Sequence, residues 1–271
     1  MLKLFLSGIA IGIANIIPGV SGGTIAFILG IYDKLTDSIG NFFICNREKR
    51  KEYLRFLIPL FIGVGGGILI FAKIIEILYK NHPQPTSFFF IGLILASLPI
   101  VLKQNKGKFD KISIISLVLG IFLVLLLLQF KEPTTINGLR TEFSLSYYFK
   151  LFLCGIVGAG AMIIPGISGS MLLLILGEYY NILSFINGIK IMPLIFVGIG
   201  IILGIVLCSK LISYLFEHYR NGTIYFILGL ILSSILGIWP GFAIENALLN
   251  IVSLILGFVT VFISEKLSVK K

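Results

Sequence analysis

The sequence is dominated by long apolar blocks that are separated by short charged segments. Only 13% of the residues are charged and the mean hydropathy is +1.06, whereas about a quarter of the residues of a soluble domain are charged. A helix needs about 20 apolar residues to cross a bilayer. The sequence therefore predicts an all-α polytopic membrane protein, a single membrane domain over 1–271, with crossing helices at 54–79, 87–102, 112–130, 190–209, 223–239 and 244–263.

One apolar phrase that contains helix-breaking residues occurs twice. IIPGVSGG occupies 16–23 and IIPGISGS occupies 163–170. When Pro18 is aligned with Pro165, eight of the 18 positions that follow from these prolines are identical, and both copies continue into LG-x-Tyr. Repetition at a fixed spacing indicates an internal repeat.

A second match extends the repeat. PTSFFFIGLILASL at 85–98 aligns with GTIYFILGLILSSI at 222–235, with seven of 14 positions identical. We therefore divide the chain into repeat one, 1–130, and repeat two, 148–266.

Each repeat begins with two apolar arms on either side of the Pro-Gly phrase. The first arms are 1–17 and 148–164, and the second arms are 20–32 and 167–180. Neither arm is comfortably long enough to span, because 13 residues of helix cover only about 20 Å of a core about 30 Å thick. We predict a re-entrant helical hairpin and three crossing helices in each repeat. Three is an odd number, so the two repeats should have inverted topology.

The charge distribution sets the predicted orientation. With a cytoplasmic N-terminus, most of the 22 basic residues fall in cytoplasmic segments, as the positive-inside rule requires. Both termini are then cytoplasmic. The basic stretch at 46–55 would lie against anionic membrane lipids. The net charge of +10 does not indicate a nucleic-acid partner, because no soluble domain is predicted to hold one.

The Pro-Gly tips have the chemistry of an anion site. Proline lacks an amide hydrogen and breaks a helix, while Ser21 and Ser168 can cap the helix that follows. Free amides and the positive end of a helix dipole attract anions. Two inverted tips would meet near the membrane midplane. The predicted substrate-binding residues are Asn15, Pro18, Gly19, Ser21, Gly22, Gly23, Thr24, Pro165, Gly166, Ser168, Gly169 and Ser170, with Arg140 from the outer loop.

Small residues also allow helices to pack closely, and tight packing is the alternative interpretation of the tips. Gly8 with Gly12, and Gly155 with Gly158, have a spacing that packs helices. Packing alone is predicted for the glycines Gly63, Gly65, Gly66, Gly67, Gly198, Gly200 and Gly204.

Four charged residues lie in or beside the apolar segments. Lys73 and Glu76 share one face of the 54–79 span, and intramembrane charges usually have a function. Asp33 and Glu178 follow the two second arms. All four are candidates for coupling transport to an ion. The alternatives are a Lys73–Glu76 salt bridge near a helix end and contact with water at the hairpin ends.

The residues at the tips leave two functional classes open, an anion transporter or channel and a serine hydrolase. The same pocket would suit a small-anion transporter or channel. Ser21 and Ser168 also lie in GxSG, the nucleophile phrase of rhomboid-type intramembrane proteases, but that chemistry needs a nearby base. His82 and His218 are predicted near opposite membrane faces, away from both serines. No His/Asp/Glu cluster has the spacing of a metal site, and we predict no metal and no cofactor.

The paired phrases resemble the polyprenyl-phosphate transporter family. NIIPGVSGGTIAFILGIYD and IIPGISGSMLLLILGEYY carry the resemblance, which covers essentially the whole chain. It implies a non-enzymatic protein that returns undecaprenyl phosphate across the bacterial cytoplasmic membrane, so that envelope polymers can reuse the carrier. The family usually has an acidic residue after LG-x-Tyr in both hairpins. Asp33 keeps it, whereas the second copy has Tyr180, with Glu178 two positions earlier.

Overall fold

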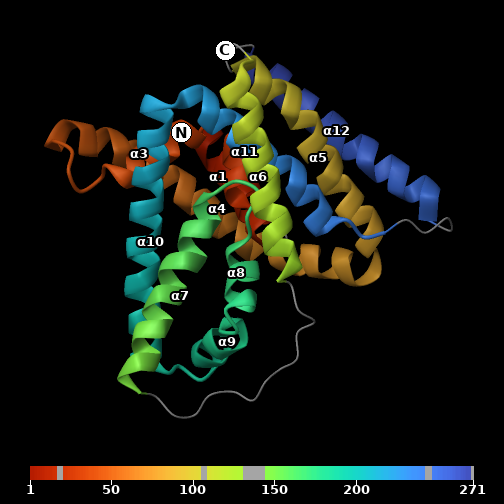
Figure 1. The fold of residues 1–271 in the computed structure, drawn as a ribbon. Helices are drawn as coiled ribbons and strands as arrows, with labels where there is room; N and C mark the ends of the chain where they lie inside the picture. Colours follow the sequence, from red (N-terminus) through yellow and green to blue (C-terminus); the bar gives the residue numbers. More distant parts are fainter. Residues whose placement is uncertain (17–20, 105–108, 131–143, 242–245, 270–271) are drawn as a thin grey trace.

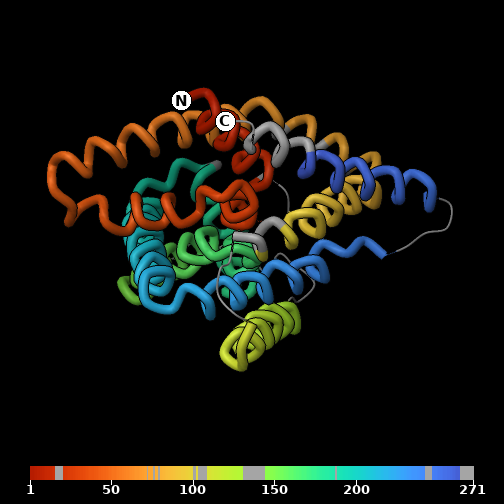
Figure 2. Tube along the Cα trace, turned by 90° about the horizontal axis from the view of Figure 1, so that it is seen from above, coloured from red at the N-terminus to blue at the C-terminus, as the bar shows by residue number. Residues whose placement is uncertain are grey.

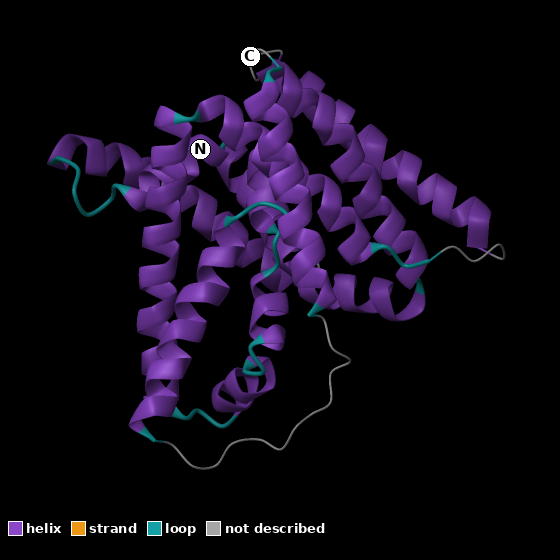
Figure 3. Cartoon of the chain, viewed as in Figure 1, coloured by secondary structure: helices purple, strands orange, loops and turns teal. Residues whose placement is uncertain are grey.

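The computed structural model of this chain is helical. It describes residues 1–16, 21–104, 109–130, 144–241 and 246–269. Those ranges contain twelve α-helices and no strand (Figure 1; Figure 3). The helices are α1 (Leu2–Ile16), α2 (Gly22–Ile28), α3 (Tyr32–Gly40), α4 (Arg47–Asn81), α5 (Pro83–Gln104), α6 (Lys111–Gln129), α7 (Leu145–Ile163), α8 (Gly169–Ile175), α9 (Tyr179–Asn187), α10 (Ile191–His218), α11 (Arg220–Ile238) and α12 (Ala247–Val269).

Five helices among the described residues are long and apolar enough to cross a bilayer. They are Arg47–Phe71 of α4 and the whole of α6, α7, α10 and α11. Helices α8 and α9 together would make a sixth span, but they are bent by 110° relative to each other. Large apolar side chains are exposed along these helices, among them Ile115, Leu119 and Phe122 of α6, and such a surface suits lipid. The prediction of an all-α polytopic membrane protein is confirmed.

The first arm of the second hairpin is longer than the sequence indicates. The apolar pattern places it at 148–164, whereas α7 begins at Leu145, because Ser144 accepts a hydrogen bond from the amide of Tyr147 at 3.3 Å and caps the helix. Its 19 residues are long enough to span, so the prediction that this arm is too short was wrong. The helix ends at Ile163, just before the Pro-Gly phrase.

A short helix follows each hairpin, α3 after α2 and α9 after α8. The sequence pattern does not separate these helices from the second arms. Gly30 and Gly177 are equivalent positions with φ angles of 68° and 72°, and a left-handed glycine ends a helix. Tyr32 and Tyr179 then begin the next helix. The repeated LG-x-Tyr phrase is therefore the turn between two short helices.

Helix α1 crosses α4, and α7 crosses α10, through glycines at equivalent positions. A Cβ atom on Gly63 would lie 3.0 Å from the Cα atom of Gly8, and one on Gly200 would lie 3.1 Å from the Cα atom of Gly155. The backbones thus touch directly, as small residues permit in membrane helices. The packing predicted for these four glycines is confirmed.

Helices of repeat one, which we call the first half, pair with helices of repeat two, the second half. Helix α5 of the first half pairs with α12 of the second, and α11 of the second half pairs with α6 of the first (Figure 1; Figure 2). Both crossings use glycines whose missing side chain leaves room for a carbonyl of the partner helix. The contacts are Gly92 with Leu254, Gly257 with Phe89, Gly229 with Leu117 and Gly120 with Phe226. Equivalent residues therefore build both pairs.

Substitution of Gly200 by leucine should destabilise the folded protein, whereas Gly198→Leu on the same helix should be tolerated. A side chain at position 200 would collide with the backbone of Phe152 and Gly155, and overpacking costs about 1–3 kcal/mol or more. Nothing lies within 4 Å of a Cβ atom at Gly198, so the packing predicted there was wrong. Thermal unfolding in detergent measures the difference, and equal midpoints for both variants would contradict the crossing.

Candidate functional site

The residues that follow the first Pro-Gly phrase contact the second Pro-Gly phrase. The Ser21 hydroxyl donates a hydrogen bond to the Ile164 carbonyl at 3.2 Å. The Gly166 amide donates to the Thr24 hydroxyl at 2.8 Å, in a buried position. The Tyr32 hydroxyl donates to the carbonyl oxygen of Ile163 at 3.0 Å. Side chains from the start of α2 and of α3 therefore satisfy backbone groups that the broken helix of the second hairpin leaves free.

The junction leaves no room for larger residues. A Cβ atom on Gly23 would lie 2.5 Å from the Ile163 carbonyl oxygen, and one on Gly166 would lie 2.5 Å from the Leu230 carbonyl group. Pro165 is buried beside them. Pro18 and Gly19 lie outside the described residues, so their predicted role stays a prediction.

The first hairpin uses its own polar groups to cap α2. The Gly22 amide donates to Asn15 Oδ1 at 3.0 Å, and the Gly23 amide donates to Ser21 Oγ at 3.2 Å. The cap predicted for Ser21 is therefore present. The amides at the start of α2 are satisfied within the protein, and they are not free for a ligand in this arrangement.

The start of α8 in the second hairpin has fewer hydrogen bonds within the protein than the start of α2 in the first. Ser168 precedes α8 but makes no side-chain cap, so the cap predicted there was wrong. Its hydroxyl instead lies 2.9 Å from that of Ser170, which is exposed. The amides of Gly169 and Ser170 donate to no other described residue. Equivalent sequences thus have different hydrogen bonding in the two hairpins.

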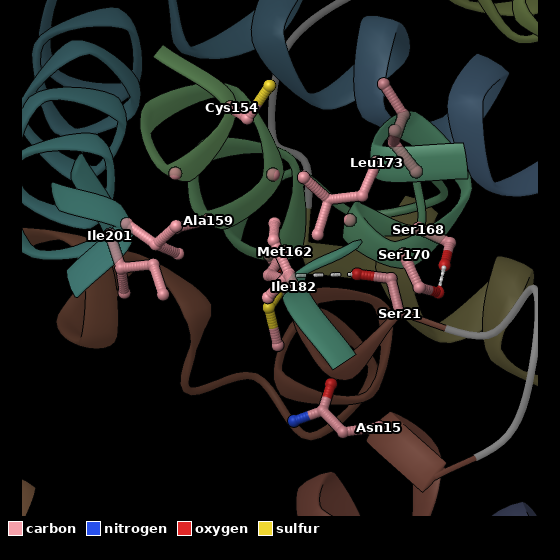
Figure 4. Close-up of a pocket in the computed structure, with 15 residues that line it drawn as sticks. Asn15, Ser21, Cys154, Ala159, Met162, Ser168, Ser170, Leu173, Ile182 and Ile201 are labelled. Atoms are coloured by element: carbon pink, nitrogen blue, oxygen red, sulfur yellow. Dashed lines mark hydrogen bonds between the residues drawn. The ribbon is translucent and has the colours of Figure 1, made fainter. Parts of the chain in front are cut away.

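A cavity of about 220 Å³ lies beside this junction, where Asn15 and Ser21 approach α7 and α8 (Figure 4). Its polar groups come from both hairpins, Asn15 and Ser21 from the first and Ser168 and Ser170 from the second. The remaining wall is almost entirely apolar, and its residues are Cys154, Gly155, Gly158, Ala159, Met162, Ile167, Gly169, Leu173, Ile182, Val197 and Ile201. An apolar cavity with a few converging polar groups is typical of a ligand site.

A buried carboxylate lies at the end of the second hairpin. Glu178 is 1% exposed. Its oxygens accept hydrogen bonds from Lys150 Nζ at 2.6 Å, from the Tyr147 hydroxyl at 2.6 Å and from Asn181 Nδ2 at 3.0 Å. A buried charge needs such partners. Glu178 was a candidate from the sequence, but this cluster around it was not predicted, although antiparallel hairpin arms place Lys150 and Glu178 at a similar depth.

The other charged candidates lie elsewhere. Asp33 forms an ion pair with Arg220 at 2.8 Å, and both side chains are about half exposed. Lys73 is exposed on α4. The side chain of Glu76 and the whole of Arg140 lie outside the described part of the chain, so the predicted Lys73–Glu76 contact and the role of Arg140 stay predictions.

The histidines do not approach the serines. His218 lies at the end of α10, where Nδ1 is 3.0 Å from the Tyr214 carbonyl oxygen. His82 is exposed at the end of α4. Within the described ranges, neither histidine is hydrogen-bonded to Ser21 or Ser168, so the arrangement that a serine nucleophile requires is not formed.

The fold and the cavity define a polytopic helical membrane protein whose broken helices meet at a central site, an arrangement typical of secondary transporters. The chain belongs to the VCA0040-like family, described as undecaprenyl phosphate translocase-like, whose profile matches residues 11–262.

Two curated relatives cover most of the chain. It is 36% identical over 253 residues to the polyprenyl-phosphate transporter of Vibrio cholerae serotype O1, a match that covers 88% of this chain and 78% of the relative. It is 32% identical over 266 residues to the polyprenyl-phosphate transporter of Staphylococcus aureus, covering 94% and 92%. No solved structure matches the chain significantly.

Proposed function

We propose that this protein moves undecaprenyl phosphate across the bacterial cytoplasmic membrane and holds the phosphate in the cavity beside the junction of the two hairpins. Family membership supports the substrate. The observation that carries the site is that hydroxyl groups of both hairpins, Ser21 and Ser168, line one cavity with otherwise apolar walls. The proposal places both termini in the cytoplasm, in agreement with the positive-inside rule.

The chemistry of the cavity suits a lipid phosphate. Moving a charged headgroup through hydrocarbon without partners is very costly. Ser168 and Ser170 present hydroxyls, and the amides at the start of α8 present further donors, which together would replace water around the phosphate. The polyprenyl tail would stay in the bilayer, beside the exposed apolar faces of the spans.

The unequal packing of the two hairpins supports transport by alternating exposure. The first hairpin is buried in the main core, where Phe27, Tyr32 and Phe216 form an aromatic cluster. Helix α3 also packs closely on α10, since a Cβ atom on Gly40 would lie 2.6 Å from the Lys210 amide nitrogen. In α8, by contrast, only Gly169 is buried. We assign this arrangement to the state in which the site faces the outer leaflet.

The opposite state follows from the proposed inversion of the repeats. In it the second hairpin would close and the first would open, so that α3 leaves α10 and the ion pair between Asp33 and Arg220 breaks. The lipid headgroup would then reach the cytoplasmic leaflet. Net direction would depend on the lipid gradient, because a carrier of this kind runs both ways.

Purified protein in liposomes tests the proposal. A fluorescent undecaprenyl phosphate is placed in one leaflet, and its loss to a quencher or enzyme on the other side is followed with time. We expect transfer that depends on the protein and saturates with lipid. Liposomes in which the labelled lipid keeps its leaflet, under conditions where an unrelated lipid translocase moves its own substrate, would refute the function. Passage of inorganic phosphate alone would indicate a small-anion transporter.

We also propose that neither serine acts as a nucleophile. The Ser21 hydroxyl is used by the Ile164 carbonyl and the Gly23 amide, and Ser168 is paired with Ser170. A serine-directed fluorophosphonate should leave both residues unmodified in the folded protein. Labelling of one of them, lost on its replacement by alanine, would instead indicate a hydrolase.

A further inference from the structure

We propose that Lys150 is the cation that receives the phosphate at the cavity, and that Glu178 holds this lysine while the site is empty. The inference rests on the proposed function and adds a headgroup ligand that neither the cavity lining nor the sequence motifs contain. It concerns the buried cluster at the junction of α7 and α9.

The ion pair lies directly beside the cavity wall. Lys150, Cys154 and Gly158 are four residues apart on α7 and so lie on one face of that helix, and the latter two line the cavity. Glu178 and Ile182 are likewise four apart at the start of α9, and Ile182 lines the cavity too. The pair therefore continues the same wall by one helical turn on each element.

The cavity needs a positive charge that its lining does not supply. Its polar lining consists of serines, an asparagine and a cysteine, with no charged residue. A phosphate monoester carries between one and two negative charges at neutral pH. Hydroxyl groups alone do not offset this charge in a low-dielectric site, whereas a lysine does so as a compact point charge.

Lys150 is the exposed member of the pair. Its side chain is 45% exposed, whereas that of Glu178 is 2% exposed. If Lys150 swings into the cavity, Glu178 keeps the hydrogen bonds from Tyr147 and Asn181. The carboxylate thus keeps two hydrogen-bond donors from the protein while the lysine moves from Glu178 to the phosphate. Moving the lysine leaves Glu178 with two neutral donors, and the pairing of Lys150 with the phosphate has to offset that cost.

The sequence repeats this lysine in the first hairpin. KLFL occurs at 3–6 and again at 150–153, and the distance to the following Pro-Gly phrase is the same in both copies. Lys3 is therefore the equivalent of Lys150, and it is exposed. In the first hairpin the residue equivalent to Glu178 is Ile31, so Lys3 has no equivalent ion pair to form. A purely structural role for the Lys150–Glu178 ion pair therefore does not explain a lysine at position 3.

The decisive variant is the neutral double substitution Lys150→Met with Glu178→Gln. Lys150→Met alone would strand a buried carboxylate and risk misfolding, whereas the double variant removes both charges. We expect it to keep its unfolding midpoint but to bind fluorescent undecaprenyl phosphate at least about tenfold more weakly, since a hydrogen bond to a charged group is lost. Lys150→Arg keeps the positive charge and should bind the lipid nearly as well as the wild type. Glu178→Gln alone should bind the lipid more tightly than the wild type and release it more slowly.

Lys34→Met is the matched control, because Lys34 forms a surface ion pair with Glu52 at 2.9 Å and does not line the cavity. It should bind and transport like the wild type. A double variant that folds and binds with wild-type affinity would overturn this inference while wild-type transport still supported the function. A wild-type protein that neither binds nor moves the lipid would overturn both.

Discussion

Replacement of Ser168 and Ser170 together by alanine is expected to slow undecaprenyl phosphate translocation about a hundredfold. Their hydroxyls are the polar side-chain groups that the second hairpin presents to the cavity. A hydrogen bond to a charged group contributes about 1.5–3 kcal/mol, and each 1.4 kcal/mol is about tenfold in affinity. The initial rate in liposomes at low lipid concentration measures this loss.

The same double substitution should leave the free energy of unfolding nearly unchanged. The two hydroxyls lie 2.9 Å from each other, and removing both partners of a hydrogen bond together is nearly neutral. Ser146→Ala is the control, because Ser146 forms a similar exposed pair with Ser144 at 2.8 Å and does not line the cavity. A double variant that folds normally and transports at the wild-type rate would show that the phosphate binds elsewhere.

Gly166→Ala is expected to cause the largest loss of stability among single substitutions at the site. Gly166 has a φ angle of 82°, and a side-chain-bearing residue in that region costs about 1–3 kcal/mol. A Cβ atom would also lie 2.5 Å from the Leu230 carbonyl group. Relief of that clash would push the tip away from α11 and break the hydrogen bond from the Gly166 amide to Thr24. Both the unfolding midpoint and transport should fall.

Gly177→Ala separates backbone strain from the clash. Gly177 has a similar φ angle of 72°, but nothing lies within 4 Å of a Cβ atom there. It should therefore show only the cost of strain. If both variants unfolded at the same temperature and transported equally, the close approach of the second tip to α11 would contribute to neither stability nor transport. The packing that positions the proposed site would then be contradicted.

The parts of this protein that follow local rules were predictable. Apolar blocks about as long as the hydrocarbon core is thick identify the spans in α4, α6, α10 and α11 but not the one in α7, and the repeated Pro-Gly phrase marks the breaks at Ile16 and Ile163. The cap at Ser21 follows from its residue type. Gly8 and Gly63 follow from the tendency of small residues to bring membrane helices together.

The parts that depend on long-range packing were not predictable from pattern. Ser21 and Ser168 stand at equivalent positions and both line the cavity, yet Ser21 caps α2 and bonds to the Ile164 carbonyl while Ser168 makes no cap and pairs with Ser170. Residue type cannot encode that difference. The partners of Glu178 come from α7 and α9, and only the three-dimensional reversal of the chain brings Lys150 next to it.

The exchange of helices between the halves has a consequence for biosynthesis. When the ribosome has completed only α1 to α6, the glycine faces of α5 and α6 have no partners, since α12 and α11 have not yet been made. These two helices must wait in the lipid, or beside an insertion factor, until nearly the whole polypeptide has emerged. Assembly therefore depends on contacts between residues far apart in sequence, which form late, and an interrupted synthesis leaves a product that cannot mature.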